Sequence, residues 1–236
     1  MITIEHNITA TRARINNAAD TYDRKRSTIS LLAVSKKQSV EAIQQAVAAG
    51  LIDFGENYLQ EAEQKIQQLQ LLNLTWHYIG GIQSNKTQTI ARLFNWVHSV
   101  DRIKLARRLS DQRPMDMPPL NICLQVNIDN EPGKSGFNAD HISAAVTEIN
   151  SLPRLQLRGL MAIPAQSDNV AKQRDSFSRM RTLYDSVKDA IDSKNDKASF
   201  DTLSMGMSAD LEPAIAEGAT IVRVGTDIFG PRDRSV

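Results

Sequence analysis

A lysine follows directly after a run of apolar residues in the stretch LLAVSKK, residues 31–37. Four apolar residues in a row predict a strand buried on both faces, and Lys36 would leave that strand at its carboxyl end. An amine held against an apolar interior has a lowered pKa and can form a Schiff base with a carbonyl ligand. A lysine that merely extends from the strand end into solvent is the alternative. Lys37 would point to the opposite face, because side chains alternate along a strand.

Two segments near the end of the sequence form a candidate anion site. In SMGMSAD, residues 204–210, Ser208 is placed to cap a short helix whose free N–H groups would favour an anion. In VRVGTD, residues 222–227, Gly225 permits close approach of the backbone and Thr226 offers a hydroxyl donor. Ordinary turn chemistry explains the same residues equally well.

An arginine interrupts the last apolar strand. Arg223 points away from the face shared by Val222 and Val224. Because a buried arginine is rarely unpaired, we expect an ion pair with an acid at a strand end, such as Glu56.

Strand-like segments alternate with helical segments along the 236 residues. The eight strand segments cover residues 30–35, 51–57, 76–80, 96–100, 120–128, 157–163, 202–205 and 220–225, and a helix over residues 12–25 precedes them. This alternation implies parallel pairing through right-handed crossovers. It predicts an α/β fold, a single (β/α)8 TIM barrel with an extra N-terminal helix that covers the last strand; a doubly wound open sheet is the alternative. The candidate residues all follow strands, at the end where barrels carry their active sites.

Composition excludes several classes of function. The 28 basic and 27 acidic residues give a net charge of +1, so we expect neither nucleic acid nor membrane as a partner. A single cysteine, Cys123, excludes an intrachain disulfide and is expected to be a buried, inert thiol. Four scattered histidines have no metal-ligand spacing, so no metal is expected. Without a signal-peptide or membrane-spanning apolar run, we expect a cytoplasmic protein, and in the absence of an apolar surface motif a monomer.

Several motifs occur together in a characteristic order. They are AVSK, FGEN, HYIGGIQSNK, GKSGF, RGLMAI, LSMGMSADLEPAI and VRVGTDIFG. Together they resemble the YggS/PROSC family of pyridoxal phosphate homeostasis proteins, over about residues 31–232. The resemblance implies one domain over residues 1–236 that binds pyridoxal 5'-phosphate (PLP) in a barrel similar to the N-terminal barrel of alanine racemase.

The resemblance also implies roles for individual residues. Lys36 would hold PLP as a Schiff base, and Arg223 would face the pyridine nitrogen. The other expected cofactor-binding residues are Asn57, Met207, Ser208, Gly225 and Thr226, of which the last three match phosphate-binding positions. Lys134, in GKSGF, matches a second lysine that would hold or pass on the cofactor. His77 and Met205 occupy strand positions that could face the ring.

The expected chemistry favours binding over catalysis. An arginine beside the ring nitrogen only donates hydrogen bonds, which weakens the ring as an electron sink and favours holding the cofactor, or racemase-like chemistry, over decarboxylation. Racemases also take a tyrosine from a C-terminal domain of the partner subunit, and we expect no such domain after the eighth strand. We therefore expect no catalytic residues, and a protein that buffers PLP or delivers it to PLP-dependent apo-enzymes, with effects on amino-acid and keto-acid balance. A weak PLP-dependent amino-acid racemase or transaminase is the alternative, and a sugar-phosphate enzyme without a cofactor is a third hypothesis.

Overall fold

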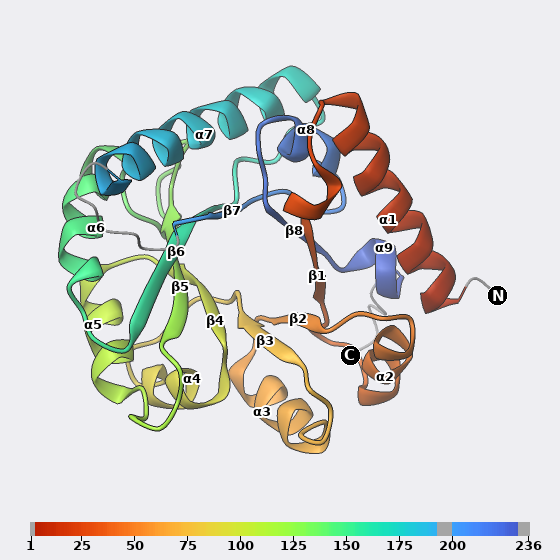
Figure 1. Ribbon diagram of the computed structural model, residues 1–236, viewed down its shortest axis with the longest axis horizontal. Coiled ribbons are helices and arrows are strands. Elements are labelled where there is room, and N and C mark those ends of the chain that lie inside the picture. Colours follow the sequence, from red (N-terminus) through yellow and green to blue (C-terminus); the bar gives the residue numbers. More distant parts are fainter. Residues whose placement is uncertain (1–2, 193–199, 231–236) are drawn as a thin grey trace.

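Eight parallel strands close into a barrel (Figure 1). The computed structural model describes residues 3–192 and 200–230. The strands are β1 (Ser30–Val34), β2 (Asp53–Glu56), β3 (Thr75–Tyr78), β4 (Trp96–Val100), β5 (Leu120–Val126), β6 (Leu155–Ala162), β7 (Thr202–Ser204) and β8 (Ile221–Val224). Each strand pairs in parallel with the next, and β8 pairs with β1. The predicted TIM barrel is therefore confirmed, and the open sheet is wrong.

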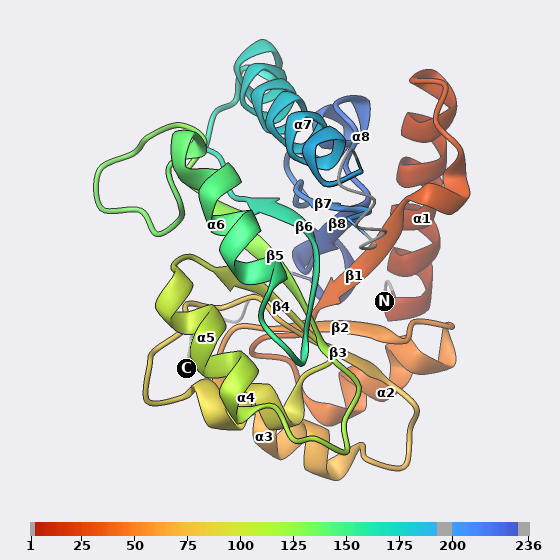
Figure 2. The ribbon, with the colours of Figure 1, turned by 60° about the vertical axis from the view of Figure 1, so that its left-hand side comes forward.

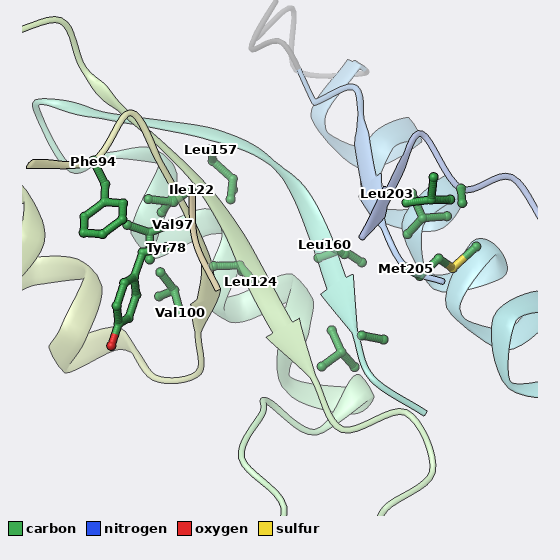
Figure 3. Packing of buried hydrophobic residues seen from close by; sticks show 14 of the residues in the cluster. Tyr78, Phe94, Val97, Val100, Ile122, Leu124, Leu157, Leu160, Leu203 and Met205 are labelled. Atoms are coloured by element: carbon green, nitrogen blue, oxygen red, sulfur yellow. The ribbon is translucent and has the colours of Figure 1, made fainter. Parts of the chain in front are cut away.

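Helices surround the ring of strands, as Figures 1 and 2 show. They are α1 (Ile4–Thr21), α2 (Val40–Ala48), α3 (Leu59–Gln68), α4 (Thr87–Leu93), α5 (Ile103–Gln112), α6 (Ile142–Asn150), α7 (Val170–Asp192), α8 (Leu211–Ala216) and α9 (Thr226–Phe229), with short 3-10 helices at Arg26–Thr28 and Ala139–His141. Apolar residues of strands and helices form a shared core between the two layers, part of which is drawn in Figure 3. Within it the rings of Tyr78 and Phe94 meet edge to face, with centroids 5.1 Å apart.

The N-terminal helix begins earlier than its sequence pattern suggests. We expected it over residues 12–25, but α1 starts at Ile4, where the Thr3 hydroxyl accepts a hydrogen bond from the His6 N–H group. Buried Ile8 extends over those added turns the apolar face that Ile15 continues within the expected range. The helix packs against α8 and α9, which follow the last two strands (Figure 1). An extra helix that covers the closure of the barrel is thus confirmed.

The helix after β7 starts later than expected. Asp210, not Ser208, occupies the N-cap position, and α8 begins at Leu211. Pro213 explains the shift, because a proline lacks the N–H group needed beyond the first helical turn. A helix that began at Ala209 would leave the carbonyl group of that residue without its donor. Ser208 therefore lies in a turn that precedes the helix.

Candidate functional site

The seven residues that the sequence predicts to bind a cofactor line one cavity of about 220 Å³. These residues are Lys36, Asn57, Met207, Ser208, Arg223, Gly225 and Thr226. They come from the last residues of four strands, β1, β2, β7 and β8, or from the segments that follow them. The cavity therefore lies at the carboxyl end of the barrel, where sites of this fold are found.

The exit of β1 separates its two lysines. Lys36 is half-buried and lines the cavity, whereas Lys37 is exposed and is not among the lining residues. The backbone of Lys37 has a φ of 61°, in the left-handed region, and its N–H group donates a 2.5 Å hydrogen bond to Glu61 Oε1. This turn fixes the two side chains on different sides, so Lys36 supplies the amine to the cavity.

A second lysine, buried behind this turn, holds the chain in place. Lys65 Nζ donates hydrogen bonds of 2.6 Å to the Ser35 carbonyl oxygen, 2.7 Å to Glu56 Oε1 and 2.5 Å to Glu61 Oε1. The Ser35 hydroxyl donates to the same Glu56 oxygen at 2.6 Å. Burial raises the pKa of Glu56, although the Lys65 ammonium opposes that rise. The residue before Lys36 is thereby tied to both β2 and α3.

Arg223 is buried and bonded to backbone and hydroxyl oxygens. Its Nη1 atom donates to the Ser204 carbonyl oxygen at 2.7 Å and to Ser204 Oγ at 2.8 Å, and Nη2 donates to the Ala162 carbonyl oxygen at 2.9 Å. The expected ion pair with Glu56 is wrong, because Glu56 is paired with Lys65. Burial lowers the pKa of Arg223 to about 10, so the guanidinium remains charged at neutral pH.

The described residues accept three of the five N–H groups of Arg223. The guanidinium also borders the cavity. It can therefore donate a further hydrogen bond to a molecule bound there.

The loops after β7 and β8 expose backbone donors. The N–H groups of Ser208, Ala209, Thr226 and Asp227 find no acceptor among the residues that the structure describes. Gly206 makes the first loop possible: its φ is 90°, and a Cβ atom there would lie 2.5 Å from the Ala214 Cβ atom. Backbone donors gathered in this way suit an anion such as a phosphate group.

Arg14 of α1 joins these two loops. It donates hydrogen bonds of 2.8 and 2.9 Å to the two carboxylate oxygens of Glu212 and one of 3.1 Å to the Ser208 carbonyl oxygen. It also pairs with Asp227 at the start of α9. One side chain thus connects the N-terminal helix to both sides of the candidate anion site.

Asn57 places an unused acceptor at the cavity. Its Oδ1 atom is buried and has no hydrogen-bond partner in the described part of the chain. Gly80 packs against the same turn, since a Cβ atom there would lie 2.1 Å from the Asn57 carbonyl oxygen. A buried acceptor without a partner is costly unless a ligand supplies the donor.

Comparison with known proteins identifies the family. The model for the alanine racemase N-terminal domain matches residues 4–233. The chain is 52% identical to the pyridoxal phosphate homeostasis protein of Pseudomonas aeruginosa, over 99% of this chain and 97% of that protein. It is 46% identical to the protein of that name in Escherichia coli K12, over 98% of each. This chain belongs to the pyridoxal phosphate homeostasis protein family.

Solved structures of similar proteins have the same barrel fold. PipY of Synechococcus elongatus PCC7942, solved with PLP bound, is 36% identical and superposes with a TM-score of 0.80 over 92% of this chain and 99% of PipY. Alanine racemase of Corynebacterium glutamicum shares the barrel alone: it is 15% identical, with a TM-score of 0.69 over 95% of this chain and 59% of the racemase.

Three residues singled out from the sequence lie elsewhere. Lys134 is on the loop after β5, which projects from the barrel in Figure 2; its amine pairs with Glu131 and lies 3.5 Å from the Pro164 carbonyl oxygen. It does not line the cavity. His77 and Met205, which could have faced a ring, are buried and do not line the cavity either.

Lys65 and Arg14 are the supporting residues that the sequence interpretation missed. Lys65 had a detectable signal, because it continues the buried positions of α3, three residues after Ala62 and six after Leu59. Arg14 had none, since its partners are some 200 residues away in the chain.

The structure also bears on a reactive cysteine, a metal site and a membrane-spanning helix. Cys123 is buried as expected, and burial raises the pKa of its thiol to about 12. Within residues 3–192 and 200–230, no three His, Cys, Asp or Glu side chains gather in a way that could hold a metal ion. No helix in those ranges has the length and apolar character needed to cross a bilayer.

Proposed function

We propose that this chain binds PLP in the cavity, holds it through Lys36 and takes part in PLP homeostasis. The observation that carries the proposal is the convergence of the Lys36 amine, the Arg223 guanidinium and the two donor-rich loops on one cavity. The chain matches, over nearly their whole length, relatives that are named pyridoxal phosphate homeostasis proteins, which supports the proposal. The PLP bound to PipY supports it too.

The residues present match the groups of this cofactor. The Lys36 amine can condense with the aldehyde to a Schiff base, releasing water. The free N–H groups of the loops after β7 and β8 suit the phosphate, and the Thr226 hydroxyl adds a donor. Arg223 offers donors to the ring nitrogen, and Asn57 Oδ1 offers an acceptor to a polar ring substituent.

The arginine favours holding the cofactor, or racemase-like chemistry, over decarboxylation. Bound PLP supplies a ring that withdraws electrons most strongly when its nitrogen is protonated. Arg223 stays charged at neutral pH and only donates hydrogen bonds, so it would leave that nitrogen without a proton. This disfavours reactions that need a strong electron sink, such as decarboxylation. We propose a binding protein, with a weak racemase or transaminase as the alternative. Delivery to PLP-dependent apo-enzymes, a cytoplasmic location, a monomeric state and a single domain over residues 1–236 stay predictions.

An absorption spectrum with matched lysine variants tests the proposal. Purified protein mixed with PLP should show the visible band of a lysine-bound cofactor, and Lys36→Ala should abolish it. Lys37→Ala is the matched control, because its side chain is exposed and its backbone keeps the same turn. Borohydride reduction followed by peptide mass mapping should place the pyridoxyl group on Lys36.

Two results would contradict this assignment. A pyridoxyl group mapped to Lys37 or Lys134 would move the covalent site, and no band at any PLP concentration would reject it. Separately, loss of optical rotation from L-amino acids, or amino-group transfer to a keto acid, would favour the enzyme alternative over a binding protein.

A further inference from the structure

A row of hydrogen-bonded side chains runs through the barrel from Arg223. Arg223 Nη1 donates to Ser204 Oγ at 2.8 Å, and Ser204 Oγ lies 2.9 Å from His98 Nδ1. His98 Nε2 lies 2.9 Å from His77 Nδ1, and His77 Nε2 lies 3.3 Å from Asp53 Oδ1. We call these five residues, from β8, β7, β4, β3 and β2, the relay.

The relay connects the two mouths of the barrel. Ser204 is on β7 and His98 is on β4, and these strands are not neighbours in the sheet, so their contact crosses the interior. Arg223 borders the candidate cofactor cavity, whereas Asp53 is the first residue of β2 and borders a separate cavity of about 310 Å³. The middle residues are buried, and the side chain of Asp53 is 35% exposed.

The two ends impose one direction on the hydrogen bonds. A guanidinium only donates and a carboxylate only accepts. The Ser204 hydroxyl accepts from Arg223 and keeps its own hydrogen for His98 Nδ1. His98 must then carry its hydrogen on Nε2 and donate to His77, which in turn donates from Nε2 to Asp53. The reverse direction would set a nitrogen lone pair of His77 against the carboxylate.

Both imidazoles are held neutral. Burial lowers the pKa of His77, although the Asp53 carboxylate opposes that shift. Burial lowers the pKa of His98 well below its ordinary value, with His77 and Arg223 adding to the effect. The ring of Trp96 stacks on His77, with centroids 5.4 Å apart, and restricts its rotation. Each imidazole thus has one hydrogen and one lone pair, and the direction of donation is the property left to set.

We propose that Ser204, His98 and His77 are positioning residues that orient the Arg223 guanidinium toward the cofactor, and that Asp53 at the opposite mouth sets their direction. Ser204 Oγ accepts a hydrogen bond from Nη1, which leaves other N–H groups of Arg223 for a ligand. The inference rests on the proposed function only where it concerns PLP. The tautomers of the two histidines are a property of the cofactor-free protein.

Histidine NMR reads the relay directly. The chain has four histidines, and His6 and His141 are exposed and lie outside the relay, so they serve as internal references. In cofactor-free protein labelled with 15N-histidine, His77 and His98 should both appear as neutral Nε2–H tautomers at pH 7. A Nδ1–H tautomer, or a charged imidazole, at either position would overturn the proposal.

A pair of substitutions at Asp53 separates the hydrogen bond from the charge. Asp53→Asn keeps an oxygen that accepts from His77, whereas Asp53→Leu has similar size and no acceptor. Both remove the charge, and the site is partly exposed, so both variants should fold. Asp53→Leu should lose the uniform tautomers and bind PLP about fivefold more weakly, the effect of about one hydrogen bond, while Asp53→Asn stays close to the parent protein.

The absorption band of bound PLP gives a second readout, because a substitution that only weakened the fold would not change its wavelength. Asp53→Leu should shift the band and Asp53→Asn should not. Equal tautomers, PLP affinities and spectra in the two variants would overturn the proposal. Uniform Nε2–H tautomers in a protein that takes up no PLP would support the relay and reject the proposed function, so the two failures are distinguishable.

Discussion

The Nζ atom of Lys65 lies 2.6 Å from the carbonyl oxygen of Ser35, the residue that precedes Lys36. The same ammonium group contacts Glu56 and Glu61, so all three of its hydrogens have acceptors. A buried lysine thereby joins β1, β2 and α3 directly behind the amine that we assign to the cofactor. The charge is offset by a carboxylate that is itself fully buried.

Replacing Lys65 with methionine should strongly destabilise the protein. Met keeps the length of the side chain but leaves the buried Glu56 carboxylate without its cation, and breaking a buried pair in this way costs about 3–5 kcal/mol of the free energy of unfolding. Urea denaturation of the cofactor-free variant at pH 7 measures the loss. The double variant Lys65→Met/Glu56→Leu should recover much of it. A double variant no more stable than the single one would contradict the assignment.

Glu56 should make stability depend on pH in the opposite sense from an ordinary paired carboxylate. Burial raises its pKa in the folded state above the ordinary 4.5, so the folded protein binds more protons there than the unfolded chain. Its contribution to the free energy of unfolding therefore rises as the pH falls through the folded pKa toward 4.5. In urea titrations, the free energy of unfolding of the parent protein, relative to that of Glu56→Gln, should increase as the pH is lowered from 7 to 4.5. A constant difference across the range would contradict the raised pKa.

The sequence predicted the residues that line the cavity better than the residues that support them. Lys36 and Arg223 could be singled out because one follows a strand end and the other interrupts an apolar strand, and a barrel brings its strand ends together. Asn57 was predicted from the family resemblance alone. Lys65 was missed although it continues the buried positions of α3. The relay and Arg14 could not be found, because their contacts join elements far apart in the sequence. Local patterns carry no information on such partners.

The starts of two helices differ from the sequence prediction for local reasons. The first helix begins at Ile4 because Thr3 caps it, a signal that is hard to recognise within a polar segment. The helix after β7 begins at Leu211 because of Pro213. The second difference moves Ser208 from a cap into a turn, yet it still lines the cavity. Its place in the site follows from the loop after β7, not from the helix.

Arg14 should contribute to PLP binding more than to stability. It joins the Ser208 carbonyl oxygen to Asp227 and thus holds together the two loops that we propose to bind the phosphate. Exposed ion pairs contribute about 0–1 kcal/mol, so the melting temperature of Arg14→Ala should change little. The loosened loops should raise the dissociation constant for PLP about three- to tenfold, equivalent to about one hydrogen bond. Fluorescence titration with PLP measures this change.

Arg12→Ala is the matched control for that experiment. Arg12 lies on the same helix, but it donates to the carbonyl oxygens of Ala49 and Gly50 after α2, away from the loops. Its substitution should leave the affinity for PLP unchanged. Equal affinities in the two variants would show that α1 does not support the anion site.

Gly206→Ala should damage both stability and binding. The φ of 90° is unfavourable for alanine, and the new Cβ atom would lie 2.5 Å from the Ala214 Cβ atom of α8. Strain of this kind costs about 1–3 kcal/mol, and relief by movement of the loop would displace Met207 and Ser208 from the cavity. Gly81→Ala is the control, because nothing lies within 4 Å of a Cβ atom there. Calorimetry and PLP titration should show a lower melting temperature and weaker binding for Gly206→Ala alone; normal binding by that variant would mean that the loop after β7 does not hold the phosphate.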